Sequence, residues 1–276
     1  MFTEAEFAER FVAALCTLQD EDRTYEFRVE SGVTGKPRAS SLGSCARQQY
    51  YKLTKTPVTE SVDVKTGKFS PWSALMGHAG QSLAELVLQR MGYTITVRGL
   101  PDDLPYSGHI DGILSGLDLE KPALWDSKIR SEYGVRQLAT KSVKQTDLEM
   151  YMQMQAYMKA LHLTYAVLTV IPHSLSSMRQ EMSRYKLDIP SVQVTRVIIE
   201  ADSEAQDILT QRAIDLAAAQ AMGVMVHREF NPVGKEHAVF PCGWCEWRTQ
   251  CMVDEFIEEQ ITVTPLPVAT VDLEAA

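Results

Sequence analysis

Several features that mark other protein classes are missing from this chain. No apolar run approaches the roughly 18 residues that a membrane-crossing helix needs, so we expect no membrane partner. The first stretch, MFTEAEFAERFVAALC, lacks the basic start of a secretory signal, which predicts a cytoplasmic protein. SGVTGKP, around Lys36, lacks the spacing and the Ser or Thr of a Walker motif, so any helicase activity would come from a partner.

Cysteine is scarce, with five residues in 276. An odd number of cysteines in a cytoplasmic chain argues against a disulfide framework and favours metal-binding or reactive thiols. Cys16 lies in the amphipathic first helix, where we expect it to pack. Cys242, Cys245 and Cys251 fall within PCGWCEWRTQC, and three soft ligands are one short of a tetrahedral site. Cys45 stands apart from them.

Positive charge is also in deficit, because 27 Lys and Arg face 36 Asp and Glu for a net charge of −9. Six acids and no Lys or Arg lie after Cys251, and without them the net charge rises to −3. Residues 128–144 carry a local excess of positive charge that could follow a phosphate backbone, although a solvated basic face explains it as well. Their cations are Lys128, Arg130, Arg136, Lys141 and Lys144.

Hydrophobic periodicity predicts alternating helices and strands, which together favour a central mixed β-sheet flanked by helices. The expected helices cover about 3–19, a segment from about 41 through CARQQYYKLT, SPWSALMGHAGQSLAELVLQRMG, TDLEMYMQMQAYMKAL, and DSEAQDILTQRAIDLAAAQAMG, capped by Asp202 or Ser203 and ended by Gly223. The expected strands are YTITV, a hairpin of YSGHIDGILSG with ALWDSKIR, TYAVLTVIP, SRYKLDIP and VTRVIIE.

Two neighbouring strands carry residues suited to chemistry. In WDSKIR, the period of two places Asp126 and Lys128 on one face of the strand. If Asp111 in GHIDGIL faces the same way, two carboxylates and an ammonium meet at one edge of the sheet. Such oxygen ligands suit Mg²⁺ or Mn²⁺, and a lysine beside them can activate water, which points to phosphodiester hydrolysis. The triplet alone also occurs by chance as surface charge.

Helices on either side of these strands add polar side chains. QMQAY places Gln153 and Tyr157 four residues apart on one helical face. His78, Gln81 and Glu85 share one face of the helix that precedes the strands. Taken singly, a core tyrosine and a polar surface stripe explain these patterns equally well.

In this order the stretches resemble the RecB-like branch of the PD-(D/E)XK nuclease superfamily, and within it the iron–sulfur exonucleases of CRISPR loci and their phage relatives. The resemblance runs from about Ser41 to Cys251 through SCARQQYY, GHAGQ, GHIDGI, WDSK, QMQAY and CGWCEWRTQC. It implies a restriction-endonuclease-like fold in a single nuclease domain, 1–256, with a core at about 70–200. Cluster-binding segments would lie at about 41–54 and 238–256, and 257–276 would form a flexible acidic tail.

The resemblance also implies roles for the residues of the two strands. Asp111 and Asp126 would bind the catalytic Mg²⁺ or Mn²⁺ with the backbone carbonyl of Ser127, and Lys128 would act on the attacking water. Gln153 and Tyr157 would support the site or the DNA strand. The family's helix ligand is a His or Glu that follows a glycine. Here we expect His78 in that role, with Gln81 as the alternative or as a contact to metal-bound water. Asp126 stands where many relatives carry Glu.

In the relatives, four thiolates hold one [4Fe–4S] cluster, and chain order assigns that role here to Cys45, Cys242, Cys245 and Cys251. Such a cluster would join the N- and C-terminal helical segments and close a long loop. Zinc is the alternative, because a Cys₄ set is one of its preferred structural sites.

The function implied is a metal-dependent DNA exonuclease, with endonuclease activity left open, in the cytoplasm of a bacterial or phage-infected cell. It would act on single strands or DNA ends in recombination, repair or phage DNA metabolism, with a helicase or recombination protein as a candidate partner. The alternative is a catalytically weak or inactive DNA-binding partner stabilised by the cluster or zinc. The expected DNA contacts are Arg47, Arg130, Arg136, Lys141 and Lys144, with Tyr50, Tyr51 and Tyr133 as candidates for base stacking.

Overall fold

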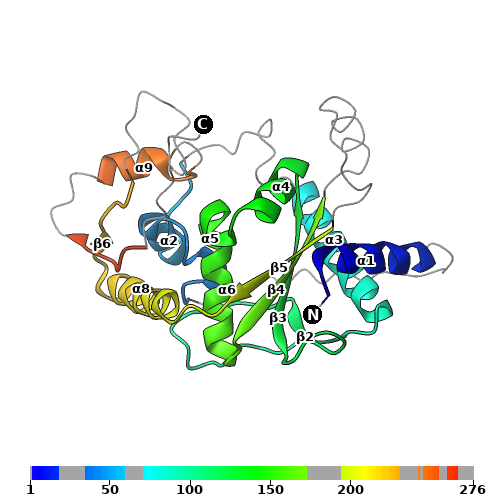
Figure 1. The fold of residues 1–276 in the computed structure, drawn as a ribbon. Helices are drawn as coiled ribbons and strands as arrows, with labels where there is room; N and C mark the ends of the chain where they lie inside the picture. The colour runs from blue at the N-terminus through cyan, green and yellow to red at the C-terminus, as the bar shows by residue number, and fades with distance from the viewer. Residues whose placement is uncertain are drawn as a thin grey trace.

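The computed structural model describes residues 2–18, 35–59, 71–172, 194–230, 242, 245–254 and 260–266. Its centre is a five-stranded sheet of order β1-β2-β3-β4-β5 (Figure 1). The β3–β4 pair is parallel and the other three pairs are antiparallel, so the mixed sheet and the hairpin-like pair of β2 and β3 are confirmed. The predicted strand SRYKLDIP lies outside the described residues. The strands are β1 (Thr94–Thr96), β2 (Gly112–Ser115), β3 (Ala123–Arg130), β4 (Tyr165–Pro172) and β5 (Thr195–Glu200).

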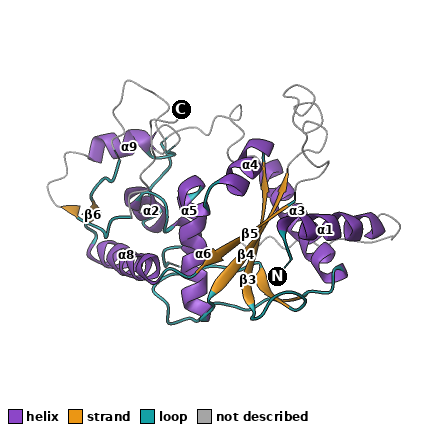
Figure 2. Cartoon of the chain, viewed as in Figure 1, coloured by secondary structure: helices purple, strands orange, loops and turns teal. Residues whose placement is uncertain are grey.

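Helices cover both faces of this sheet (Figures 1 and 2). On one face lie α1 (Glu4–Leu18) and α3 (Pro71–Arg90). On the other face lie α6 (Leu148–Leu161), α4 (Glu132–Thr140) and α5 (Val143–Thr146), followed outward by α2 (Ala46–Leu53) and α8 (Ser203–Met222). η1 (Ala39–Ser41) packs against α6. The periphery of that side holds α9 (Arg248–Val253) and the short parallel pair β6 (Met225–Val226) and β7 (Gln260–Ile261).

Successive side chains of β3 point into two different hydrophobic cores, and this alternation decides which face of the sheet Asp126 and Lys128 occupy. Trp125 is fully buried in the core beneath α1 and α3, whereas Leu124 is buried in the core beneath α6. Because successive strand residues point to opposite faces, Asp126 and Lys128 are in phase with Leu124 and face α6.

Capping side chains define the starts of α6 and α8, the helices on the Asp126 side of the sheet. The Asp147 carboxylate accepts the Met150 N–H at the start of α6. Asp202 caps α8 in the same way, and Gly223, with φ +66°, ends it, as the sequence predicts. A capping side chain of this kind stabilises a helix by about 1 kcal/mol.

Part of the segment expected to be a flexible tail is folded. β7 pairs with β6, and Thr264 donates its N–H and its hydroxyl to Asp215 at 2.8 and 2.6 Å. Val263 beside it is buried. The tail prediction is therefore corrected for 260–266, because these residues find partners in α8 and β6; residues 267–276 lie outside the described part. Within the described residues, no helix is both long enough and apolar enough to span a membrane.

Candidate active site

Asp111 and Asp126 lie opposite each other at the start of the β2–β3 pair. The antiparallel register pairs Gly112 with Trp125, and continuing it by one residue places Asp111 opposite Asp126. Side chains of directly opposed residues point to the same face. The Asp111 carboxylate also accepts the backbone N–H of Ser127 at 2.9 Å, which holds it against β3. The structure thus brings together the two carboxylates that the sequence singles out.

The charges of Asp111, Asp126 and Lys128 act on one another's protonation. Burial, followed by the charge of Asp126, raises the pKa of Asp111 to about 7. Lys128 Nζ lies 2.6 Å from Asp126 Oδ2. Burial opposes the charged form of Lys128, but the carboxylates of Asp126 and Asp111 outweigh it and raise the lysine's pKa, so the ammonium is charged at neutral pH.

These residues fit a divalent cation. Asp126 is only 2% exposed, and its Oδ2 accepts no hydrogen bond of ordinary geometry despite the nearby ammonium. A buried carboxylate oxygen whose neighbouring donor is an ammonium, beside a second, partly buried carboxylate, is a donor set that Mg²⁺ and Mn²⁺ prefer. Among the described residues, no group of three or more His, Cys, Asp or Glu side chains is already gathered around a common point suited to a metal.

The helix facing the carboxylates contributes Tyr157 and Gln153. Tyr157 is buried, and burial, with the charge of Asp126 as the next cause, raises its pKa; a hydrogen bond with Gln153 acts in the opposite direction. Gly108, just before Asp111, leaves room for this tyrosine, because a Cβ at Gly108 would come within 2.7 Å of Tyr157 Oη. The structure therefore places the QMQAY pair at the carboxylates.

Helix α3 approaches the site from the other face of the sheet. A Cβ on Gly80 would meet Ile129 Cδ1 at 2.2 Å, so α3 touches β3 closely at this point. His78 and Gln81 flank Gly80 and are half-buried. The charge of Glu85 in α3 is the smallest of the named causes that act on the pKa of Asp111. The sequence prediction did not assign Glu85 a role, although it shares a helical face with His78 and Gln81.

The residues proposed to contact DNA divide into buried and exposed sets. Arg47 is 1% exposed and donates to the Val226 carbonyl at 2.8 Å and to Gln260 Oε1 at 2.5 Å. This burial argues against the predicted DNA contact. Tyr50 and Tyr51 are buried as well, which leaves no ring face for stacking. In contrast, the exposed or half-exposed set lies on β3, α4 and α5: Arg130, Tyr133, Arg136, Lys141 and Lys144.

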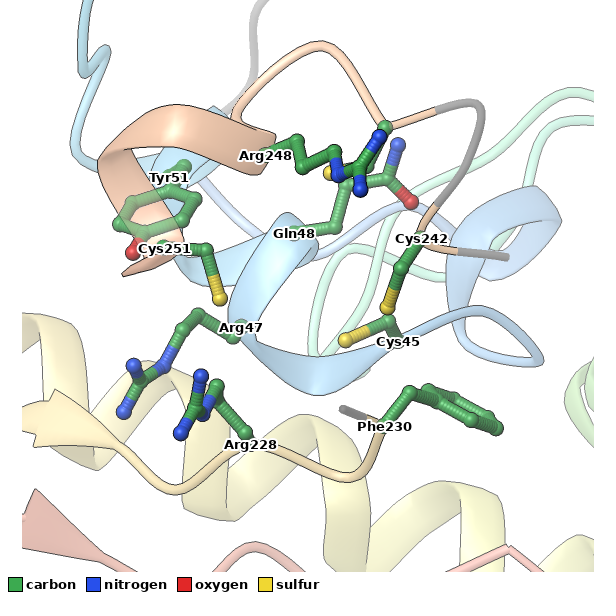
Figure 3. A pocket seen from close by; sticks show the side chains of 10 residues that line it. Cys45, Arg47, Gln48, Tyr51, Arg228, Phe230, Cys242, Arg248 and Cys251 are labelled. Atoms are coloured by element: carbon green, nitrogen blue, oxygen red, sulfur yellow. The ribbon is translucent and has the colours of Figure 1, made fainter. Parts of the chain in front are cut away.

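The four cysteines line one pocket between α2 and α9 (Figure 3). Cys45 sits at the N-cap position of α2. Burial, followed by the charges of Cys45, Cys251 and Cys245, raises the pKa of Cys242 to about 11. Thiolates gathered here therefore need a compensating positive charge. The cavity is small, about 20 Å³, which is close to the space of one water molecule.

An arginine supplies a second sign that the cysteine pocket suits an anionic centre. Arg47 lines the pocket, and its Nη1 is buried without a hydrogen-bond partner. A metal held by four thiolates carries net negative charge and accepts N–H donors at sulfur. The donor set of the pocket thus fits a structural metal centre, although the described side chains are not preassembled around one.

No protein-family model and no curated protein matches this chain. Solved structures to which this chain is similar include the one named SSO0001, with 14% identity, 91% of this chain and 96% of that chain covered, and a TM-score of 0.43. Another is LHK-Exo of Laribacter hongkongensis in complex with dAMP, with 16% identity, coverage of 68% and 89%, and a TM-score of 0.48. A phage-related exonuclease from Haemophilus somnus 129PT has 16% identity, coverage of 66% and 91%, and a TM-score of 0.39. Exonucleases are among these structures. The functional assignment depends on the residues of this chain.

Proposed function

We propose that this protein is a metal-dependent DNA exonuclease that hydrolyses phosphodiester bonds. The observation that carries the proposal is the opposition of Asp111 and Asp126, with the Lys128 ammonium 2.6 Å from Asp126. A buried carboxylate, a partly buried one and a cation on adjacent strands match the site that the family resemblance implies. The β2–β3 register, set by the surrounding core, holds them together.

Each residue has a role that follows from its position. Asp111 and Asp126 would hold Mg²⁺ or Mn²⁺, which supplies Lewis-acid charge at the scissile phosphate and lowers the pKa of water. Lys128, whose ammonium lies 2.6 Å from Asp126, would stabilise negative charge on the phosphate and orient the attacking water. Tyr157, packed against Gly108 and bonded to Gln153, positions the strand or the carboxylates.

We propose Glu85 as a further candidate for the acidic helix ligand, beside His78 and Gln81. Glu85 is the α3 side chain whose charge acts on Asp111, and a carboxylate is a better ligand for Mg²⁺ or Mn²⁺ than a neutral amide. Gln81, one turn earlier on the same face, would then contact metal-bound water.

The cysteine pocket would hold a structural metal centre formed by Cys45, Cys242, Cys245 and Cys251. The family resemblance favours [4Fe–4S], and a single Zn²⁺ is the alternative, because four thiolates are one of its preferred structural sites. In either case the centre joins α2 to the α9 segment and leaves the carboxylates free for catalysis.

Digestion of end-labelled DNA tests the catalytic proposal. Linear single-stranded, linear double-stranded and circular DNA are incubated with the full chain in Mn²⁺, in Mg²⁺ and in EDTA. An exonuclease shortens linear DNA from an end and spares circles, whereas cleavage of circles indicates an endonuclease. Asp126→Asn should slow cleavage by at least about a hundredfold, and Asp103→Asn, at an exposed position, serves as the matched control.

Two outcomes would decide against this function. Cleavage that persists in Asp126→Asn would overturn the site assignment. Metal-loaded wild-type protein that binds DNA and never cleaves it would favour the alternative, an inactive DNA-binding or recombination partner.

Anaerobic purification with visible absorption and metal analysis tests the cysteine centre. A [4Fe–4S] cluster gives coloured protein with iron and sulfide, and the rival site gives colourless protein with one zinc. Cys245→Ala should lose the metal in both cases. Cys16→Ala, in α1 beneath the other face of the sheet, should retain it. Protein from which neither metal is recovered would contradict the proposal.

A further inference from the structure

A further pocket, lined mainly by polar side chains, lies at the end of β3, beyond Asp126 and Lys128. It encloses about 280 Å³ between β3, α4 and the start of α6. This volume approaches that of small-ligand sites, and it is far too small for a DNA duplex. Its lining residues are Arg130, Tyr133, Gly134, Gln137, Leu138, Lys141, Gln145, Thr146 and Asp147. We refer to it as the α4 pocket.

The α4 pocket continues the row of side chains that forms the catalytic site. Asp126, Lys128 and Arg130 alternate along β3 and therefore share one face, spaced by about 6.6 Å per step. A strand bound at the carboxylates can therefore reach the pocket within about two steps along β3.

The cations of the pocket are suited to a phosphate. Arg130 Nη2 is held 2.7 Å from Asp147 Oδ2, and Asp147 is itself fixed as the cap of α6. This pair orients the guanidinium, while its side chain stays about one-third exposed. Lys141 is exposed, and within the described residues no hydrogen bond or ion pair engages its ammonium. The pocket lining therefore carries two cations, Arg130 and Lys141, and one carboxylate, Asp147, which already pairs with Arg130.

The aromatic residue of the pocket is suited to an unpaired base. Tyr133 is 72% exposed at the first turn of α4, although burying a tyrosine ring is normally favourable. An exposed ring beside two cations and the amide of Gln137 can stack one base and bind its neighbouring phosphate. A base within a duplex cannot offer its face to such a ring.

We propose that the α4 pocket is a subsite for one unpaired nucleotide of the DNA strand that enters the active site. Its base stacks on Tyr133, and its phosphate pairs with Arg130 and Lys141. The inference rests on the proposed nuclease function and adds to it a preference for a single-stranded end. It also assigns the strand a path along β3 from the carboxylates toward α4.

Binding of labelled single-stranded oligonucleotides in EDTA tests the subsite without cleavage. An abasic residue is moved one position at a time along the oligonucleotide, and affinity is measured by fluorescence anisotropy. One position should cost about tenfold in affinity, the value expected for one stacked base. Tyr133→Ala should lose about the same factor on unmodified DNA and become insensitive to the abasic residue at that position. Tyr133→Phe keeps the ring and should behave as wild type.

Charge variants test the phosphate contact. Lys141→Ala should weaken binding and reduce its salt dependence by about one phosphate contact. Lys121→Ala, an exposed lysine just before the opposite end of β3, is the matched control and should bind like wild type.

An unchanged abasic profile in Tyr133→Ala would overturn the subsite, as would RNA of the same sequence binding more tightly than DNA. If wild-type protein shows the Tyr133-dependent profile but never cleaves DNA in Mg²⁺ or Mn²⁺, the nuclease function fails and the nucleotide subsite stands.

Discussion

Arg212 and Glu229 form a bidentate ion pair in which the arginine is completely buried. Nη1 lies 2.6 Å from Oε1, and Nη2 lies 2.7 Å from Oε2. Nη2 also donates to the Ser44 carbonyl at 2.7 Å, and Glu229 Oε2 accepts the Ala46 N–H at 2.6 Å. These hydrogen bonds hold the backbone of the residues immediately before and after Cys45. One arginine in α8 therefore positions the first cysteine of the proposed metal centre without any metal.

Replacing this arginine should destabilise the whole chain. Arg212→Met leaves the Glu229 carboxylate largely buried without its partner, and a broken buried pair costs about 3–5 kcal/mol. Urea unfolding of the metal-free protein measures the loss. The control is Lys159→Met, which breaks the exposed pair with Asp207 and should cost less than about 1 kcal/mol. Equal losses in the two variants would contradict the role given to Arg212.

A ligand role for Glu85 predicts a contrast within α3. Glu85→Gln should lower cleavage by about tenfold or more and raise the Mn²⁺ concentration that is required, because a carboxylate ligand is lost. His78→Gln should stay within about threefold of wild type. Glu85→Gln should also lower the pKa of Asp111, since the charge of Glu85 helps to raise it. A larger loss in His78→Gln would restore the ligand first expected from the sequence.

Periodicity and capping chemistry sufficed to predict much of the fold. The ends of α8 follow from Asp202 and Gly223, and the placement of Asp126 with Lys128 on one face follows from the period of a strand. Helix caps and strand alternation depend on residues that are close in the sequence, so the sequence predicts them.

Burial that depends on contacts between distant parts of the chain could not be predicted from the sequence. Arg47 and Arg212 look like surface cations in the sequence, yet both are buried, because carbonyls and carboxylates distant in the chain accept their donors. The folding of 260–266 depends likewise on partners in α8. Glu85 was on the predicted polar face, but only the packing of α3 on β3 relates its charge to Asp111.

Gly80 sets the closeness of α3 to the catalytic strand, which predicts coupling to Ile129. Gly80→Ala would place Cβ 2.2 Å from Ile129 Cδ1, so the helix or the isoleucine must shift at a cost of about 1–3 kcal/mol. Improved helix propensity offsets about 1 kcal/mol of this. In Gly80→Ala with Ile129→Ala the new methyl group has room, so the double variant should be more stable than the sum of the single changes by about 1 kcal/mol or more. Additive unfolding free energies would show that the two residues do not meet.

The partly buried Asp111 predicts an unusual pH dependence for the metal-free protein. Burial, reinforced by the charge of Asp126, raises the pKa of Asp111 to about 7, compared with about 3.9 in an unfolded chain. Between these values the folded state binds more protons than the unfolded state. The stabilisation by protonated Asp111 is thus complete below about pH 4 and is lost as the pH rises through about 7.

Urea unfolding in EDTA, at intervals from about pH 5 to about pH 8, measures this dependence. Asp111 should contribute a downward slope of at most about 1.4 kcal/mol per pH unit. Asp111→Asn cannot titrate and should lose that slope, whereas Asp103→Asn, at an exposed position, should keep it. Mn²⁺ should restore stability at the higher pH values, because a cation favours the ionised carboxylates. Parallel profiles for wild type and Asp111→Asn would show that Asp111 titrates as an ordinary surface carboxylate and does not share its environment with Asp126.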